Sequence, residues 1–452
     1  MKRLFPLFLI CLMATSVAQV PASHEGHWWM SYSETIGVPL NLTFRDSTPI
    51  LYSPLQTSAP IRPTTWSYSH DSLQFSHTST GIKLSLVYHP DDSTFRGTFR
   101  QGLLKTEMLF SPTDTLLSFP RPQTPKEPFS FVAKEVKVGR KGMTLSGTLA
   151  LPTTPMPKGG YPAVVLISGS GQQNRDEELF LHRPFLVWAE YLAQRGIATL
   201  RYDDRGVGGS TGDFRNATTH DFADDAEALF RFLRKQPHIN PRLVGMMGHS
   251  EGGAIAPMVA ARNAKVAFVV MLAGQGCTGK EVLLQQNEAI FRQQGLSDSL
   301  LLLRLACMDS LFSLPNPTTE SVKALLQRQG LTPSQREAIG MTKGFEYQTA
   351  QQLSTPWMQA FLRIDPKEYL PQVQCPLLAI GGGRDCQVLS GPNLEAIHKL
   401  TVHNPRVETY APETLNHLMQ HCSTGAPSEY LFIEETVAPE VMRRVADFIL
   451  SL

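Results

Sequence analysis

The sequence predicts an α/β fold, in which a mostly parallel sheet is flanked by helices, preceded by a small all-β amino-terminal domain. From about Phe129 onward, continuous apolar runs alternate with stretches of helical periodicity, which is typical of a parallel sheet covered on both faces. Residues 28–120 instead alternate apolar and polar in short runs, the pattern of antiparallel strands with one buried face. A chain of 452 residues is long enough for roughly two to three domains.

The overall composition excludes several classes of partner. The 41 Lys and Arg residues against 40 Asp and Glu leave a net charge of +1, so neither a nucleic-acid partner nor an acidic tail is expected. Hydrophobic residues make up 42% of the chain, which argues against intrinsic disorder. After the first twenty residues no apolar run approaches the roughly 18 residues that span a bilayer, so we expect no stable membrane anchor. The oligomeric state stays open.

The first residues have the pattern of a signal peptide. Lys2 and Arg3 give a positive start, residues 4–13 are apolar, and Ser16-Val17-Ala18 offers the small residues of a cleavage site. We therefore expect residues 1–18 to be removed near Ala18 and the mature protein to be periplasmic or secreted. Such a compartment permits disulfides between the five remaining cysteines.

Residues 19–125 are expected to form the β-rich domain and its linker. Runs at 40–44, 73–75, 82–86 and 94–99 predict strands, in either a sandwich or a barrel. The linker is indicated by closely spaced prolines, which stiffen a chain: Pro120, Pro122, Pro125 and Pro128.

Residues 126–452 are expected to form the second domain. A hairpin around the turn at 139–142 comes first, and the strands predicted after it cover 163–168, 197–202, 243–247, 266–272, 376–380 and 407–410. Helical spacing is found at 185–192, 222–233, after residue 254, and at 441–448. Residues 276–365 interrupt the alternation with helices at 281–294, 300–312, 319–329 and 334–341. We interpret this insertion as a cap over the carboxyl edge of the sheet, with structural padding as the alternative.

A candidate nucleophile follows the strand at 243–247. That strand leads into Gly248-His249-Ser250-Glu251-Gly252, and a helix follows, which is the G-x-S-x-G motif in its strand–turn–helix context. The sharp turn exposes the Ser250 hydroxyl at a helix N-terminus, where the helix dipole favours a developing anion. A glycine-rich turn without chemistry is the plain alternative.

The serine needs a base and an acid, because its free hydroxyl is a poor nucleophile. In this layout the acid precedes the histidine along the chain. Asp385 follows the strand at 376–380, and His417 lies in the loop after the strand at 407–410, with His421 as the next candidate. A carboxylate at that edge orients the imidazole and stabilises its cation.

The oxyanion of an acyl-transfer reaction needs two backbone donors. Glu251, which follows the nucleophile, provides one. Ser170, or else Gly171, is expected to provide the other from the small-residue loop after the strand at 163–168. That loop and the glycines at 206–209 lack the lysine of a phosphate-binding loop.

Short motifs follow the predicted strands: Gly169-Ser170-Gly171 with Asn174-Arg175-Asp176-Glu177, Tyr202-Asp203-Asp204-Arg205-Gly206 with Gly209-Ser210, Gly248-His249-Ser250-Glu251-Gly252-Gly253, Asp385-Cys386-Gln387-Val388, and Leu415-Asn416-His417. Through them, residues 129–452 resemble the α/β-hydrolase superfamily. Within it they resemble exported bacterial carboxylesterases of the EstD type and the neighbouring serine-aminopeptidase-like hydrolases. Residues 28–110, with Trp28, Gly97-Thr98-Phe99 and Gln101-Gly102, resemble the β-rich amino-terminal domain of some exported members. Gln172 stands where relatives often have proline.

The resemblance implies hydrolysis of a small-molecule ester through an acyl-enzyme, with no cofactor and no metal. Ser250 would attack, His417 would carry the proton, and Asp385 would hold the histidine. One alternative is a peptidase, which would clamp a free terminus with carboxylates, for which Glu251, Asp203 and Asp204 are only candidates. Another is a carbohydrate- or lipid-binding protein with a degenerate hydrolase domain.

The candidate site also predicts a disulfide. Cys386 follows the candidate acid directly, and Cys422 lies five residues past the candidate base. If acid and base meet, these cysteines come near the Cα separation of roughly 4.4–6.8 Å that a disulfide requires. Two unpaired thiols are the alternative.

Overall fold

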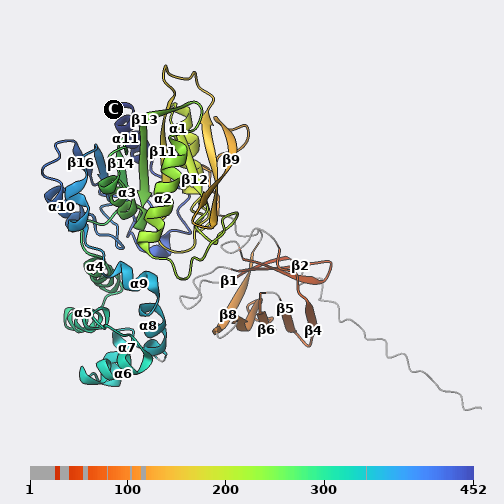
Figure 1. Cartoon of the computed structure of the whole chain (residues 1–452). Helices are drawn as coiled ribbons and strands as arrows, with labels where there is room; N and C mark the ends of the chain where they lie inside the picture. Colours follow the sequence, from red (N-terminus) through yellow and green to blue (C-terminus); the bar gives the residue numbers. More distant parts are fainter. Residues whose placement is uncertain are drawn as a thin grey trace, which may run out of the picture. The chain divides into compact units, whose positions relative to one another are not determined.

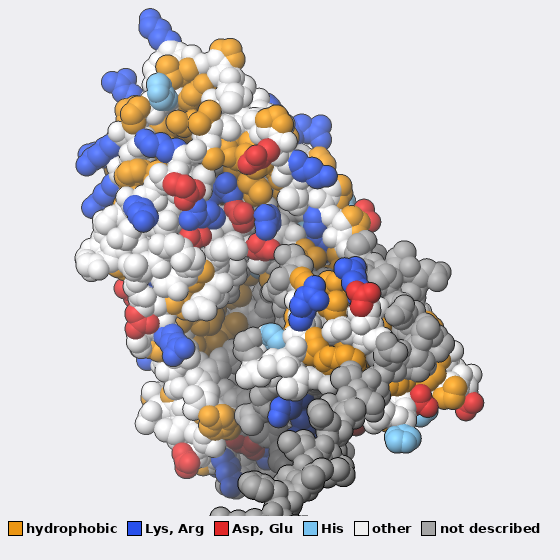
Figure 2. Space-filling model, turned by 90° about the vertical axis from the view of Figure 1, so that its right-hand side faces the viewer, with side chains coloured by type: hydrophobic (Ala, Val, Ile, Leu, Met, Phe, Trp, Pro, Cys, Tyr) orange, Lys and Arg blue, Asp and Glu red, His pale blue; other side chains and the backbone are white. Residues whose placement is uncertain are grey.

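The computed structural model describes residues 26–30, 40–53, 60–78, 80–101, 104–113, 119–342 and 344–452. The predicted signal peptide lies outside these residues. The chain divides into two compact units, Met1–Phe119 and Pro120–Leu452 (Figure 1). Figure 2 shows basic and acidic side chains scattered over one face of the molecule, with hydrophobic side chains between them. Within the described part of the chain, no helix combines the length and the apolar character that crossing a membrane requires.

The amino-terminal unit is an antiparallel sheet in the order β3-β2-β1-β8-β7-β6-β5-β4. Its strands are β1 (Gly26–Met30), β2 (Asn41–Arg45), β3 (Thr48–Tyr52), β4 (Thr65–Ser69), β5 (Ser72–His77), β6 (Ile82–His89), β7 (Thr94–Gln101) and β8 (Leu104–Thr113). Leu51 in β3 and Ile61 before β4 exchange two backbone hydrogen bonds of 3.1 and 2.8 Å. This bridge links the edge strand β3 to the segment that leads into the other edge strand, β4.

The carboxyl-terminal unit is built on a mixed sheet in the order β16-β15-β14-β13-β11-β12-β10-β9 (Figure 1). Its strands are β9 (Phe131–Arg140), β10 (Met143–Pro152), β11 (Tyr161–Ile167), β12 (Ala198–Tyr202), β13 (Ile239–His249), β14 (Val269–Leu272), β15 (Leu377–Ile380) and β16 (Val407–Tyr410). The β9–β10 hairpin and the β10–β12 pair are antiparallel, and the remaining pairs are parallel. Strand β11 is buried along its whole length, which explains its continuous apolar run.

Helices cover both faces of this sheet. On one face α1 (Pro184–Gln194) and α11 (Pro439–Leu450) pack against Val164 and Leu166 of β11. On the other face α2 (Thr219–Leu233), α3 (Glu251–Arg262) and α10 (Ser390–Leu400) belong to the core that holds the alternate β11 residues. Successive strand side chains point to opposite faces, so each face receives its own apolar layer. The arrangement places the ends of the parallel strands at one edge.

The insertion between β14 and β15 is helical and has its own small core. It contains α4 (Gly279–Gln293), α5 (Asp298–Phe312), α6 (Thr319–Arg328), α7 (Pro333–Ala338), α8 (Phe345–Leu353) and α9 (Pro356–Phe361). The sequence patterns identified α4 to α7 but not α8 and α9. Short 3₁₀ turns at Pro366–Glu368 and Leu370–Gln372 then lead back to β15.

The residues that follow Phe119, where the sequence predicts a linker, bind the carboxyl-terminal unit. Arg121 donates from Nη2 to the carbonyl oxygens of Phe180 and Leu431, at 2.8 Å each. Gln123 donates to the Val437 carbonyl at 2.8 Å and accepts from its N–H at 2.9 Å. We call residues 120–124 the strap. It joins two segments that are distant in sequence, 179–182 and 430–437.

Candidate active site

Ser250 lies at a sharp turn between β13 and α3. Its backbone has φ 55° and ψ −117°, a strained conformation for a residue other than glycine. The neighbouring glycines are required by space: a Cβ on Gly248 would lie 1.9 Å from the Gly252 carbonyl oxygen, and a Cβ on Gly252 would lie 2.2 Å from that of Ile167. The absence of side chains lets strand and helix approach closely, which presents the Ser250 hydroxyl at the end of the sheet.

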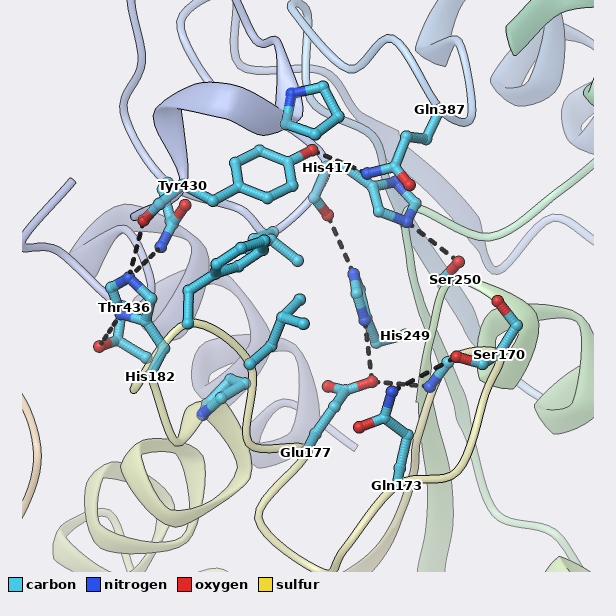
Figure 3. Close-up of a pocket in the computed structure, with 17 residues that line it drawn as sticks. Ser170, Gln173, Glu177, His182, His249, Ser250, Gln387, His417, Tyr430 and Thr436 are labelled. Atoms are coloured by element: carbon cyan, nitrogen blue, oxygen red, sulfur yellow. Dashed lines mark hydrogen bonds and ion pairs between the residues drawn. The ribbon is translucent and has the colours of Figure 1, made fainter. Parts of the chain in front are cut away.

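The structure brings Ser250, His417 and Asp385 together in one hydrogen-bonded chain. His417 Nε2 lies 3.0 Å from Ser250 Oγ (Figure 3), and His417 Nδ1 lies 2.8 Å from Asp385 Oδ2. The other Asp385 oxygen accepts the backbone N–H groups of Gln387 and Val388 at 2.8 and 2.9 Å. The Asp385 side chain is fully buried, so its orientation is fixed. This geometry can move the serine proton to the imidazole and stabilise the imidazolium that forms.

The alternative base, His421, lies elsewhere. Its two ring nitrogens contact Glu435 at 2.9 Å and Glu440 at 3.0 Å, and nearly half of its side chain is exposed. It therefore belongs to a surface ion-pair network and does not reach Ser250.

The loop after β11 runs beside the nucleophile. A Cβ on Gly169 would lie 3.2 Å from Ser250 Cβ, and Ser170 lines the same cavity as Ser250 (Figure 3). The Gly169 N–H is engaged by Glu177 Oε1 at 2.6 Å and is not available to an oxyanion. Glu251 is the first residue of α3, where a backbone N–H has no acceptor within the helix. Of the two candidates in this loop, Ser170 lines the cavity and Gly171 does not. Glu251 does not line it either but directly follows the nucleophile, so Ser170 and Glu251 are the candidate donors.

The most specific feature that sequence reasoning missed is the pair formed by His249 and Glu177. His249 Nδ1 lies 3.0 Å from Glu177 Oε1, and its Nε2 lies 3.0 Å from the His417 carbonyl oxygen. Burial favours the neutral ring, but the charge and hydrogen bond of Glu177 and the His417 carbonyl outweigh it and raise the pKa of His249. Glu177 belongs to one of the sequence motifs, but nothing in the sequence pairs it with His249.

The Glu251 side chain faces the helical insertion rather than the cavity. Trp357 of α9 donates its indole N–H to the two carboxylate oxygens at 2.9 and 3.0 Å, and the Thr219 hydroxyl donates at 2.5 Å. Complete burial raises the pKa of Glu251. This carboxylate therefore ties the helix that follows Ser250 to the insertion.

Asp203 and Asp204 also have structural partners. Asp203 accepts from the Arg175 side chain at 2.8 Å and from the Gly209 N–H at 2.9 Å. Asp204 accepts from the Ser168 hydroxyl at 3.1 Å and from the Gln173 N–H at 3.0 Å, and burial raises its pKa to about 8. Neither these aspartates nor Glu251 line the cavity, so none is placed to clamp a substrate there.

A cavity of about 290 Å³ opens onto Ser250. Its walls come from the segments before α1 and after His417; the lining residues are Gly169, Ser170, Gln173, Glu177, Leu179, Phe180, His182, Pro184, His249, Ser250, Gln387, His417, Leu418, Gln420, Pro427, Tyr430 and Thr436. His182 contacts Thr436 Oγ1 at 2.9 Å, and burial lowers the pKa of His182 to about 4, so this part of the wall is neutral. Among the described residues, none that lines this cavity comes from the insertion at 276–365, and its role as a cap stays a prediction.

The predicted disulfide is wrong. Both thiols are free: Cys386 Sγ lies 3.3 Å from the Gly425 carbonyl oxygen, and Cys422 Sγ lies 3.3 Å from that of Thr414. The acid and base loops meet as expected, but the two sulfurs turn to different carbonyls. In the described residues, no group of three or more His, Cys, Asp or Glu side chains could hold a metal ion.

Comparison with known proteins agrees with this architecture. The model of the X-Pro dipeptidyl-peptidase (S15) family matches residues 141–422. Esterase EstD of Thermotoga maritima is 25% identical over 307 residues, which cover 67% of this chain and 66% of that esterase. The uncharacterized protein PA2218 of Pseudomonas aeruginosa is 31% identical over 134 residues, which cover 29% of this chain and 33% of that protein. The chain thus spans less than two thirds of the length of either curated relative.

Solved structures include two further matches. The Pyrococcus furiosus esterase Pf2001 is 17% identical with a TM-score of 0.42, and the match covers 71% of this chain and 93% of that one. The structure of PA2218 is 18% identical with a TM-score of 0.45, covering 74% and 98%. The mixed sheet with helices on both faces and the family match confirm the predicted α/β-hydrolase fold. The chain belongs to the X-Pro dipeptidyl-peptidase (S15) family of the α/β hydrolases.

Proposed function

We propose that this chain is a serine hydrolase that cleaves carboxylic esters with short, uncharged acyl groups through an acyl-enzyme. The hydrogen-bonded chain from Ser250 through His417 to Asp385, at the edge of a cavity, carries the proposal. The relative from Thermotoga maritima, which is described as an esterase, supports the same reaction class.

In the proposed reaction, Ser250 Oγ attacks the ester carbonyl carbon while its proton passes to His417 Nε2. The backbone N–H groups of Glu251 and Ser170 stabilise the resulting oxyanion. When the C–O bond to the alcohol breaks, the leaving oxygen takes the proton from His417. A water molecule then attacks the acyl-enzyme by the same route, which releases the acid and restores the Ser250 hydroxyl.

The cavity indicates the kind of acyl group. Glu177 is the sole acidic residue among the described lining residues, and it is already bound by His249 and by the Gly169 N–H. Both contacts are made by Glu177 Oε1, so the one acidic residue of the described lining is already paired with His249 rather than free to act solely as a clamp for the ammonium group of a peptide terminus. Leu179, Phe180 and Leu418 give the walls an apolar surface. A cavity of about 290 Å³ lies just below the roughly 300–1,000 Å³ usual for ligand sites, which suits a short acyl chain.

A peptidase that removes X-Pro dipeptides is the second candidate, because the matching family is named for that activity. It would need a free carboxylate near Ser250 to hold the substrate's amino group. Glu177 is paired with His249 and with the Gly169 N–H through Oε1, and this pairing is the observation that places the peptidase second.

A substrate panel tests the proposal. Purified protein would be offered acetyl, butyryl, octanoyl and palmitoyl nitrophenyl esters beside X-Pro nitroanilides, with labelling by a fluorophosphonate probe. We expect the highest kcat/KM for the shorter acyl groups, labelling at Ser250, and a loss of turnover on the order of 10⁶ in Ser250→Ala. His417→Ala should be comparably severe, whereas the matched control His421→Ala should keep wild-type turnover. Faster cleavage of X-Pro anilides would favour the peptidase, and an unlabelled, inactive protein would favour a binding role.

Export is part of the same proposal, because residues 1–18 have the pattern of a signal peptide. Amino-terminal sequencing of protein recovered from a periplasmic extract or culture medium tests it, with a new terminus just after Ala18 as the expected result.

A further inference from the structure

His249 has two ring nitrogens, and both face oxygen acceptors. One acceptor is the backbone carbonyl of His417, at 3.0 Å from Nε2. A carbonyl oxygen carries no hydrogen, so Nε2 must be the donor. The other acceptor is Glu177 Oε1, which lies 3.0 Å from Nδ1. This oxygen also accepts the Gly169 N–H at 2.6 Å.

The Glu177 contact also requires a donor on the histidine. A proton shared between an imidazole and a carboxyl group goes to the imidazole, because the pKa of histidine is ordinarily higher by about two. An ionised carboxylate only accepts hydrogen bonds. Both nitrogens of His249 therefore carry hydrogen in this geometry, which is the doubly protonated, cationic ring. The side chains of Glu177 and His249 are 7% and 11% exposed, so solvent screens their attraction only weakly.

We propose that His249 is held as an imidazolium and that, with Glu177, it is the positioning pair that sets the geometry of the proposed ester hydrolysis. The inference rests on the proposed function. Both residues line the cavity, but in this scheme neither contacts the reacting atoms, and each acts through a group that does.

The pair connects the three segments that carry the proposed chemistry (Figure 3). Glu177 holds the backbone N–H of Gly169, which is next to the donor Ser170. His249 directly precedes Ser250 and holds the carbonyl of His417. The rings of His249 and His417 lie 5.0 Å apart, centre to centre. A neutral His249 has a single N–H and can hold Glu177 or the His417 carbonyl, but not both.

The charged groups around His249 decide in which direction pH acts. Glu177 and Asp385 favour the cation of the His249 ring, and His417 is its titratable neighbour. Asp204 interacts with Glu177 but becomes negatively charged only as the pH rises through about 8. The pKa of His249 is raised, so the cation persists above its ordinary value and is lost as pH rises through the raised pKa. Turnover should therefore fall on the alkaline side.

Charge-removing variants of near-equal size test the proposal. Glu177→Gln removes the negative charge that raises the pKa of His249, so the fall in kcat on the alkaline side should begin at a lower pH. In His249→Gln a buried carboxylate loses its cation, and kcat should fall roughly 10- to 100-fold with KM little changed. The double variant, Glu177→Gln with His249→Gln, has two neutral amides and no buried unpaired charge, so it should recover part of the kcat lost in His249→Gln. Because residue 249 no longer titrates, this variant should not show the fall in kcat on the alkaline side that His249 causes.

A purely structural role would lower kcat equally at every pH. The matched control is Glu178→Gln, the neighbouring carboxylate, which pairs with Arg183 at 3.3 Å and should leave the pH profile unchanged. Circular dichroism checks that each variant is folded.

Nitrogen-15 NMR of histidine-labelled full-length protein gives a second readout that does not need activity. The His249 signals are assigned by their loss in His249→Gln, and at neutral pH both nitrogens should resonate at the frequency of a protonated ring. One unprotonated nitrogen, or an alkaline fall at the same pH in Glu177→Gln and wild type, would overturn the proposal. Turnover that survives Ser250→Ala would instead overturn the proposed function, while NMR still tests the ion pair.

Discussion

Asp203 and Asp204 are consecutive carboxylates whose pKa values move in opposite directions on folding, which makes Asp204→Asn an informative perturbation. Burial raises the pKa of Asp204 from 3.8 to about 8. Its two hydrogen bonds, from the Ser168 hydroxyl and the Gln173 N–H, are too few to offset the loss of water. At neutral pH the folded protein therefore keeps this group mostly protonated, whereas the unfolded chain ionises it.

The sign and size of the effect follow from that difference. For an acid with a raised pKa, the unfolded state releases its proton first, so the free energy of unfolding falls as pH rises from about 4 to 8. A tenfold difference in proton affinity between the folded and unfolded states corresponds to about 1.4 kcal/mol, so the free energy of unfolding at pH 7 is lowered by Asp204 on the order of 4 kcal/mol. The amide in Asp204→Asn cannot ionise, but its NH₂ group is a donor placed beside the donors that Asp204 accepts from, which costs about 1 kcal/mol of folding free energy. We expect the variant to be more stable than wild type by about 3 kcal/mol at pH 7 and by little or nothing near pH 4.

The assay is urea unfolding of wild type and variant, followed by circular dichroism between pH 4 and 8, with the difference taken at each pH so that other titrating groups cancel. Asp203→Asn is the matched control. Burial alone would raise the pKa of Asp203, but the hydrogen bonds of Arg175 and Gly209 outweigh burial and lower it. That carboxylate stabilises the fold above its unfolded pKa, so Asp203→Asn should destabilise the protein at neutral pH. A gain in Asp204→Asn that stayed constant from pH 5 to 8 would refute the reasoning.

Two further predictions concern the connections of the carboxyl-terminal unit. A chain beginning at Pro120 should fold and retain hydrolysis. A chain beginning at Phe129 lacks Arg121 and the rest of the strap, and each lost hydrogen bond costs about 1 kcal/mol, so we expect its thermal unfolding midpoint to be lower by several degrees. Equal midpoints for the two chains would contradict a stabilising role for the strap. Trp357→Phe removes the indole donor from the buried carboxylate of Glu251 and should cost about 1–3 kcal/mol, measured by urea unfolding, with earlier proteolysis of the insertion. Because the Glu251 backbone N–H is untouched, kcat should change little, and a large loss of kcat at wild-type stability would show that the insertion acts on the proposed chemistry directly.

The parts of the site that the sequence predicted were those with local signals. The position of Ser250 follows from a strand, a tight turn and a helix within a dozen residues, and the glycines beside it are required by space. His417 and Asp385 could be chosen because each follows a predicted strand, and parallel strands end at one edge of the sheet. Strand β16 was predicted with its observed bounds, Val407–Tyr410. The structure shows where these residues lie, and their catalytic roles remain for the variants to test.

The features that the sequence did not reveal depend on contacts between distant segments. Glu177 and His249 are 72 residues apart, and no periodicity links them. The thiols of Cys386 and Cys422 lie on loops that do meet, but the direction of a sulfur depends on a side-chain rotation that spacing cannot specify. The bridge between Leu51 and Ile61 likewise links segments that no sequence pattern pairs.

The crowded glycines around Ser250 have a consequence for how this chain can change over time. A side chain on Gly248 would collide with the backbone of Gly252, and one on Gly252 with the backbone of Ile167, so neither obstacle can move aside as a flexible side chain would. No second substitution nearby relieves either collision, because the obstructing atoms are main chain in every sequence. The side chain at position 250 meets no such collision, since it faces the open cavity, although the backbone strain at φ 55° disfavours β-branched residues there. Evolution or design can therefore exchange the nucleophile on this turn, but not the glycines that shape it.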